Sequence, residues 1–180
     1  MGPKYKARQP DSGKVLYRPE RDGGVDLTGM KLDEISRLGV VKTNQVITDF
    51  DSLTMRDSML LSAARPWYER FWVIGAEKRL RSESHAELLR YLDYFGIEHP
   101  DDPALSAGDK KLLDIVRCLL VKPRFLLMDE PTAGLADDQT RLVMDLMTQL
   151  VEDEDISIVI VEHDLGVIWE ICEFVHFMAD

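Results

Sequence analysis

The stretch Phe125-Leu126-Leu127-Met128-Asp129-Glu130-Pro131 places four apolar residues directly before two adjacent carboxylates and a proline. This apolar run is too short for a buried helix, and its composition is typical of a strand of a parallel sheet that helices cover on both faces. Ligands bind such sheets beyond the carboxyl ends of the strands. The stretch therefore predicts that Asp129 and Glu130 stand at a binding edge. An isolated acidic pair would more simply be the solvated end of a strand, so the neighbouring segments decide between the two interpretations.

A second strand ends in polar residues about thirty positions later. The β-branched run Ile156 to Val161 leads into Glu162-His163-Asp164. Between the two strands, the pattern predicts a helix that Asp137 or Asp138 caps and that reaches about Val151. A strand, a helix and a strand form a right-handed parallel crossover. Because parallel strands end at the same edge of a sheet, we expect Glu130 and His163 to converge.

The remaining elements alternate between strands and helices, which is the pattern of an α/β fold. The segment from Ser106 has two interpretations. Ser106 with Asp109 three positions later is a capping box that needs no ligand, but a helix start fronted by serine and glycine also offers backbone N–H groups to a phosphate. Both can hold at once. Further strands are expected at 14–17, 40–41 and 174–178, and further helices at 32–38, 54–64, 67–95, 106–120 and 165–172.

Composition and charge exclude several classes of function. The 33 acidic and 22 basic residues give a net charge of −11, and no basic face emerges that would bind nucleic acid. No apolar run approaches the roughly 20 residues that cross a bilayer, so any membrane association is expected to go through a protein partner. Cys118 and Cys172 lie in helical apolar patterns and are expected to be buried thiols in a cytoplasmic protein. The histidines show no metal-ligand spacing, and Gly13-Lys14 lacks the glycine and hydroxyl residues of a phosphate loop.

Taken in order, four segments resemble the motif set of ATP-binding cassette (ABC) ATPases. They are Leu105 to Asp109, Phe125 to Pro131, Gly134 to Asp138 and Glu162 to Asp164. The chain resembles most closely the nucleotide-binding subunits of branched-chain amino-acid and urea importers, whose characteristic turn, strand and loop recur at 10–13, 37–45 and 133–135. The similarity extends from Pro10 to Met178. It implies a P-loop NTPase-like parallel sheet, incomplete at its N-terminus, with an ABC-type helical subdomain.

The resemblance implies roles for the matching residues. Glu130 would polarise the attacking water as general base, His163 would contact the γ-phosphate of ATP, and Asp129 would hold Mg²⁺ through water. Gln45 would be the loop glutamine that touches the metal and the water. Ser106 and Gly108 would grip a phosphate across a dimer, and Asp137 would communicate with the opposite subunit. These roles suit phosphoryl transfer, which needs positioning and charge stabilisation more than covalent chemistry.

The resemblance also implies an organisation and partners. One partial ABC domain would span residues 1–180, with a strand and loop part at 10–50, a helical subdomain at 51–122 and a core at 123–180. The partners would be a second ABC ATPase subunit and an integral membrane permease at the inner face of the membrane. Two features depart from the family. Asp109 stands where the signature usually has glutamine, and the adenine-stacking strands and phosphate loop would precede Pro10. We therefore expect an ABC subunit cut at both ends.

Two functions from different classes remain open at the level of sequence. The first is an ATP-hydrolysing importer subunit, which Glu130 and His163 favour. The second is a non-catalytic ABC-like interaction protein that binds no ATP on its own, which the missing phosphate loop favours. A repair or chromosome ATPase of the same superfamily is disfavoured because no long heptad arm interrupts the chain.

Overall fold

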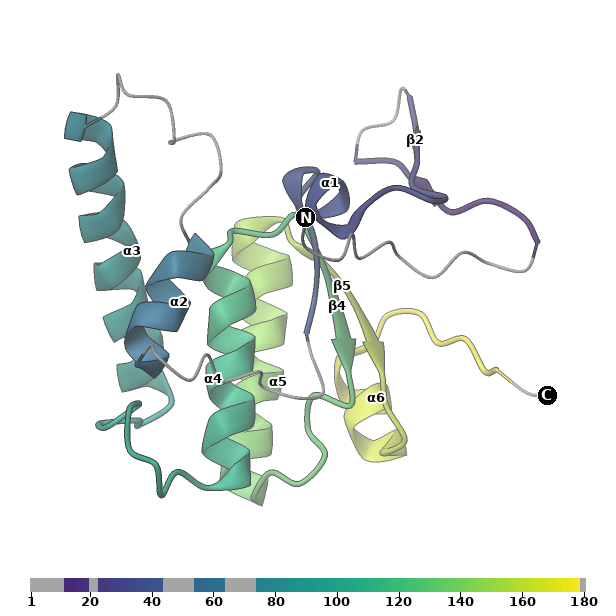
Figure 1. Ribbon diagram of the computed structural model, residues 1–180. Helices are drawn as coiled ribbons and strands as arrows, with labels where there is room; N and C mark the ends of the chain where they lie inside the picture. The colour runs from purple at the N-terminus through teal and green to yellow at the C-terminus, as the bar shows by residue number, and fades with distance from the viewer. Residues whose placement is uncertain (1–11, 20–22, 44–53, 64–73, 179–180) are drawn as a thin grey trace.

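The computed structural model describes residues 12–19, 23–43, 54–63 and 74–178 (Figure 1). The strands are β1 (Leu16–Tyr17), β2 (Val25–Asp26), β3 (Val40–Lys42), β4 (Phe125–Asp129) and β5 (Ser157–Val161). The helices are α1 (Leu32–Arg37), α2 (Met55–Ala63), α3 (Ile74–Tyr94), α4 (Ala107–Leu120), α5 (Asp137–Glu154) and α6 (Leu165–Ile171). This alternation confirms the expected α/β fold.

The central sheet is parallel and has the strand order β3-β4-β5. Val40 of β3 pairs with Phe125 of β4, and Phe125 pairs with Ser157 of β5. Asp129 stands opposite Val161, so β4 and β5 end level with each other. Both α4 and α5 begin at this same end of the molecule (Figure 1). The carboxyl edge of the sheet therefore gathers the strand ends and two helix N-termini.

The helices α4 and α5 lie on one side of the sheet (Figure 1). Leu126 and Met128 of β4 are fully buried in the core on that side. On the other face, Phe125 is half-buried and meets Tyr17 of β1 edge to face, with ring centroids 5.9 Å apart. Burial of β4 on both faces, expected from its uniform apolar run, is therefore only half met. Leu126 and Met128 are fully buried, whereas the alternate residues of the strand are partly exposed.

The helices α2, α3 and α4 share one hydrophobic core with the sheet. Met59 of α2, Leu88 of α3 and Leu112 of α4 are all fully buried in it. The predicted start of α2 is confirmed, because the Thr54 hydroxyl accepts the Asp57 N–H at 3.1 Å. Of the helix expected over 67–95, α3 covers the part that lies within the described residues. No helix in the described parts of the chain is long and apolar enough to cross a membrane.

Two expectations about the C-terminal half are wrong. The N-cap of α5 is Ala136, whereas Asp137 and Asp138 are its first helical residues. The helix begins earlier than expected because the Gln139 side chain accepts the Ala136 N–H at 3.3 Å. In a capping box, the side chain three residues after the N-cap makes this bond to the N-cap N–H. The second error concerns the strand expected at 174–178. This segment forms no strand and pairs with no described strand. A strand needs a neighbour for its backbone groups, and Phe174 and Phe177 are instead 83% and 74% exposed.

Candidate functional site

The acidic pair stands at the carboxyl edge of the sheet, as predicted. Asp129 is the last residue of β4, and its Oδ2 lies 3.3 Å from the ammonium of Lys42 at the end of β3. The Asp129 N–H points to the Thr43 hydroxyl at 3.3 Å. The Asp129 carboxylate is 24% exposed, so its charge is held at the edge beside the Lys42 ammonium and is partly accessible to solvent.

Glu130 turns the chain out of the sheet in a left-handed backbone conformation, with φ of +47°. Residues with a side chain rarely adopt this region and hold it only when their surroundings enforce it. The enforcing contacts are present at both backbone groups of Glu130. Its N–H donates to the Val161 carbonyl at 2.8 Å, and its carbonyl accepts a hydrogen bond from Lys111 of α4. Strain of this kind is concentrated at functional sites.

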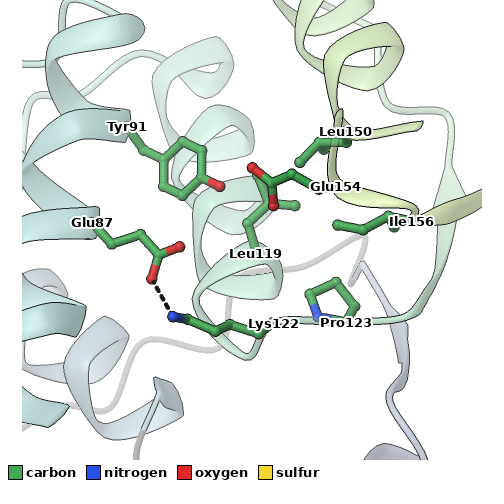
Figure 2. A pocket seen from close by; sticks show the side chains of 8 residues that line it. All are labelled: Glu87, Tyr91, Leu119, Lys122, Pro123, Leu150, Glu154 and Ile156. Atoms are coloured by element: carbon green, nitrogen blue, oxygen red, sulfur yellow. Dashed lines mark ion pairs between the residues drawn. The ribbon is translucent and has the colours of Figure 1, made fainter. Parts of the chain in front are cut away.

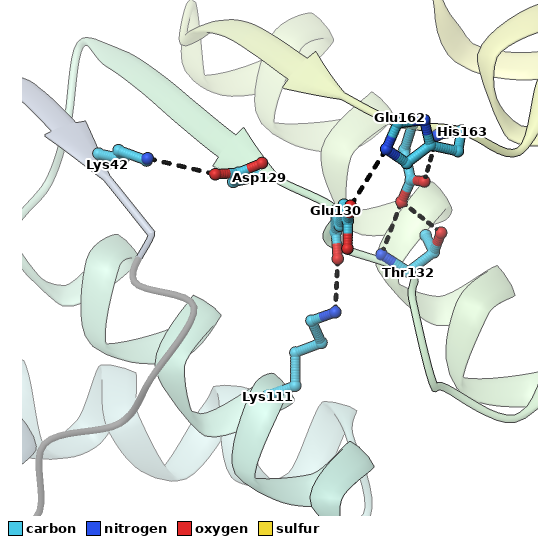
Figure 3. A network of polar contacts seen from close by, with 7 residues as sticks. All are labelled: Lys42, Lys111, Asp129, Glu130, Thr132, Glu162 and His163. Atoms are coloured by element: carbon cyan, nitrogen blue, oxygen red, sulfur yellow. Dashed lines mark hydrogen bonds and ion pairs between the residues drawn. The ribbon is translucent and has the colours of Figure 1, made fainter.

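Glu130 and His163 converge, which confirms the central expectation from the sequence (Figure 3). The Glu130 Oε1 lies 3.2 Å from the His163 Nε2. The histidine side chain is 81% exposed and the glutamate 39%. A polar contact this exposed stabilises a fold little. The pair is instead available to a group that arrives from solvent.

Glu162 ties the turn after Glu130 to the segment that carries His163 (Figure 3). Its Oε1 accepts both the N–H of Thr132, at 2.9 Å, and the Thr132 hydroxyl. Its Oε2 accepts the His163 N–H at 3.1 Å. One half-buried carboxylate therefore adds side-chain bonds between the two backbone segments from which Glu130 and His163 extend, beside the bond of the Glu130 N–H to the Val161 carbonyl.

Lys111 joins α4 to the acidic edge. Its ammonium donates to the carbonyls of Glu130 and Ala133, the latter at 2.7 Å. Burial lowers the pKa of Lys111 below its usual value, while the charges of Glu162, Glu130 and Asp129 oppose that shift. The residue thus places a partly buried cation close to the three carboxylates of Glu162, Glu130 and Asp129.

The predicted helix start at Ser106 is confirmed. The Ser106 hydroxyl accepts the Asp109 N–H at 3.0 Å and lies 2.7 Å from the Asp109 Oδ2, to which it donates. The Ser106 N–H points to the same carboxylate oxygen at 3.3 Å. This is the capping box that the sequence predicts. Asp109, which departs from the usual signature, therefore serves the helix cap.

The structure places most, but not all, of the predicted site residues on this edge. Asp137 is the first residue of α5, close to the turn that follows Glu130. Gln45 lies outside the described residues. Sequence reasoning missed the contacts of Lys42, Lys111, Thr132 and Glu162. Each of these residues lies in or within two residues of a segment that the sequence analysis singled out. That adjacency was the available signal, but it does not show which side chains meet.

The carboxylate oxygens at the edge are suitable ligands for a Mg²⁺ ion that is also bound by phosphates. Mg²⁺ takes hard oxygen ligands and is commonly bound by one or two carboxylates together with substrate phosphates. Asp129 and Glu130 offer such oxygens. Within the described part of the chain, no three His, Cys, Asp or Glu side chains are grouped to hold an ion by themselves. The carboxylates present therefore suit a metal that arrives with phosphates.

A small cavity of about 200 Å³ lies elsewhere, between the C-terminal ends of α4 and α5 and the side of α3 (Figure 2). The Lys122 ammonium pairs with Glu87 at 3.4 Å on its wall. Ile156, which lines it, directly precedes β5, and Pro123, which also lines it, lies two residues before β4. The cavity is thus at the amino-terminal edge of the sheet, opposite to the acidic pair, and we do not assign the site to it.

Comparison with known proteins agrees with this geometry. The ABC transporter family model matches residues 5–133. The high-affinity branched-chain amino acid transport ATP-binding protein LivG of Escherichia coli K12 is 27% identical over 175 residues, which are 93% of this chain and 67% of that protein. The probable branched-chain amino acid transport ATP-binding protein LivG of Archaeoglobus fulgidus is 29% identical, over 94% of this chain and 65% of that protein. The chain thus spans about two thirds of the length of these relatives.

Solved structures share the fold. A dimeric ATP-binding cassette in a post-hydrolysis state, bound to ADP and Pi, superposes with a TM-score of 0.68 at 23% identity, over 89% of this chain and 66% of that one. A nucleotide-free ATP-binding cassette from an ABC transporter gives a TM-score of 0.60 at 23% identity, over 83% and 63% of the two chains. The family match covers well over half of the sequence and includes the acidic strand end. The chain therefore belongs to the ABC transporter family.

Proposed function

We propose that this chain couples ATP binding and hydrolysis to uptake of branched-chain amino acids or related small solutes, together with a second ABC ATPase subunit and an integral membrane permease. The observation that carries the proposal is the 3.2 Å approach of Glu130 Oε1 to His163 Nε2 at the carboxyl edge of a parallel sheet. The relatives LivG of Escherichia coli and of Archaeoglobus fulgidus are named for branched-chain amino acid transport, which supports the substrate class.

In this proposal the acidic edge does the chemistry only where a phosphate loop holds the nucleotide beside it. In such a half-site Glu130 would act as general base toward the attacking water, and His163 would contact the γ-phosphate. Asp129 and Gln45 would be the residues that hold Mg²⁺. The metal, when bound, neutralises charge that develops on the phosphates. Lys111 and Glu162 keep the backbone of Glu130 and His163 in place, so that the two side chains meet the phosphate with little rearrangement.

The second contribution is made across the dimer. Ser106 and Gly108 close on a nucleotide held by the other subunit, and Asp137 contacts that subunit. The N-terminus of α4 offers backbone N–H groups to a phosphate, and the helix dipole favours negative charge there. The expected organisation follows: residues 10–50 carry Gln45, residues 51–122 form the helical subdomain that meets the permease at the cytoplasmic face, and residues 123–180 carry the acidic edge.

The experiment measures ATP turnover by the 180-residue chain alone and mixed with a full-length ABC subunit. These residues contain no G-x-x-x-x-G-K-[ST] loop to cradle the phosphates. We therefore expect no turnover by the chain alone and one competent site per mixed dimer. Ser106→Ala should lower the turnover of the mixture more than Glu130→Gln, because Glu130 serves the half-site that lacks the loop. Ser82→Ala, an exposed serine of α3, is the matched control.

Two outcomes contradict the proposal. Appreciable turnover by the purified chain alone that Glu130→Gln abolishes would show that the site is not divided in this way. A mixture whose turnover equals that of the full-length subunit alone, and which Ser106→Ala leaves unchanged, would instead favour a non-catalytic interaction protein.

A further inference from the structure

The side chain of Gln139, in the first turn of α5, bridges two segments of the site. Its Nε2 donates to the Asp109 Oδ1 of α4 at 3.0 Å. Its Oε1 lies 3.3 Å from the Ala136 N–H, the group at the N-cap of α5. Gln139 is half-buried. One amide group thus connects the start of α4 to the loop that leads into Asp137.

Each of the two carboxylate oxygens of Asp109 accepts a hydrogen bond from a different side chain. The Oδ2 accepts from the Ser106 hydroxyl, and the Oδ1 accepts from Gln139. A hydrogen bond to a charged acceptor is stronger than a neutral one. The Ser106 turn is therefore anchored through Asp109 to Gln139, and through Gln139 to Ala136.

Gly108 makes room for this bridge. A Cβ built at Gly108 would come within 2.7 Å of the Gln139 Oε1 and within 3.4 Å of the Leu135 side chain. Any side chain at this position would push the Gln139 amide away from its two partners. The glycine of the signature turn and the glutamine of α5 are thus sterically matched.

We propose that Gln139 is a positioning residue, which with Asp109 holds the signature turn at Ser106 and Gly108 and the loop before Asp137 as one unit. The inference rests on the proposed function, in which both segments face a nucleotide and a subunit across the dimer. If the two segments are locked together, the phosphate-binding turn is presented in one geometry, and less ordering has to occur when the second subunit closes.

A charge exchange between the two residues tests the bridge. Gln139→Glu keeps an oxygen that can accept the Ala136 N–H. It loses the N–H that donates to Asp109, and the introduced carboxylate repels the Asp109 carboxylate. Asp109→Asn in the same chain restores the bond, because the introduced amide can donate to the introduced carboxylate and still accept from Ser106. Gln149→Glu makes the same change at an exposed position of the same helix and is the matched control.

The first measurement is hydrogen exchange of the isolated chain, which needs no nucleotide. Gln139→Glu should raise amide exchange in both 105–110 and 133–138, the double variant should restore protection in both, and Gln149→Glu should change neither. A melting curve of each variant shows whether the chain is folded. Faster exchange in one segment only, in neither, or without restoration in the double variant would overturn the proposal.

The second measurement is ATP turnover in mixtures with a full-length ABC subunit. Loss of a hydrogen bond to a charged group should raise the KM for ATP about tenfold in Gln139→Glu, with kcat little changed, and the double variant should recover most of that loss. A KM equal to that of Gln149→Glu would overturn the proposal. If the wild-type mixture shows no turnover of its own, the proposed function fails, and the exchange measurement still decides the role of Gln139.

Discussion

Glu130 aims its carboxylate at His163 from a backbone conformation that few side chains adopt. The cost of such a conformation is on the order of 1–3 kcal/mol, and other contacts have to offset it. Here the Val161 carbonyl and the Lys111 ammonium bind the two backbone groups of Glu130. A single residue at the acidic edge is thus positioned by three elements, β4, β5 and α4.

Cys118 of α4 provides a test of the core at the scale of one residue. Burial raises the pKa of its thiol to about 12, from 9.0 in the free side chain. Below pH 9 the thiol is protonated in both states and has no effect on stability. Between pH 9 and 12 the unfolded thiol ionises while the folded one stays neutral, so stability falls as pH rises.

The expected loss between about pH 9 and 10 is about 1 kcal/mol of unfolding free energy. Urea unfolding at both pH values measures it, and Cys118→Ala should lack this part of the pH dependence. An identical pH dependence in the two proteins would show that the thiol is accessible to water in the folded chain.

At the scale of elements, α4 and α5 begin side by side with unequal caps. The N-cap Ser106 of α4 accepts the Asp109 N–H with its hydroxyl, whereas the N-cap Ala136 of α5 has no side-chain acceptor. Ala136 already has the extended backbone of an N-cap, with φ of −72° and ψ of 160°. Only the hydroxyl is missing for a complete capping box with Gln139.

Ala136→Ser should therefore stabilise the chain by about 1 kcal/mol, because serine at this position satisfies a free N–H of the first helical turn. Chemical unfolding measures the change. Ala107→Ser, which puts the same hydroxyl at the first helical residue of α4, should give no comparable gain. Equal effects of the two substitutions would mean that the cap of α5 contributes nothing.

At the scale of the whole molecule, the sheet is covered unevenly. Val159 and Val161 of β5 are 45% and 54% exposed, on the face away from α4 and α5. Trp169 of α6 is 64% exposed. No described strand pairs with the outer edge of β5. An open sheet edge with exposed apolar side chains favours association.

We expect the isolated chain to associate with increasing concentration, and Val159→Thr with Val161→Thr to weaken this association. Sedimentation velocity over a concentration series measures it. Val151→Thr, at an equally exposed position of α5, is the control and should leave association unchanged. A chain that stays monomeric at all concentrations would count against a role for this face.

The sequence by itself determined the strands of the parallel sheet, the helix start at Ser106 and the meeting of Glu130 with His163. Short apolar runs, capping residues and the shared edge of parallel strands are local or topological features, so they can be read along the chain. The error at Phe174 to Met178 has the same origin, because an apolar run shows β-propensity but not whether a neighbouring strand is present.

Only the tertiary structure decided which long side chains reach the site. Lys42 meets Asp129 across 87 positions, Lys111 reaches the Glu130 carbonyl across 19, and Gln139 bonds Asp109 across 30. These contacts depend on the rotation of each helix about its axis and on which rotamers the packing allows, and neither is encoded in residue spacing. The left-handed turn at Glu130 was equally hidden, because the contacts that enforce it come from elements distant in the sequence.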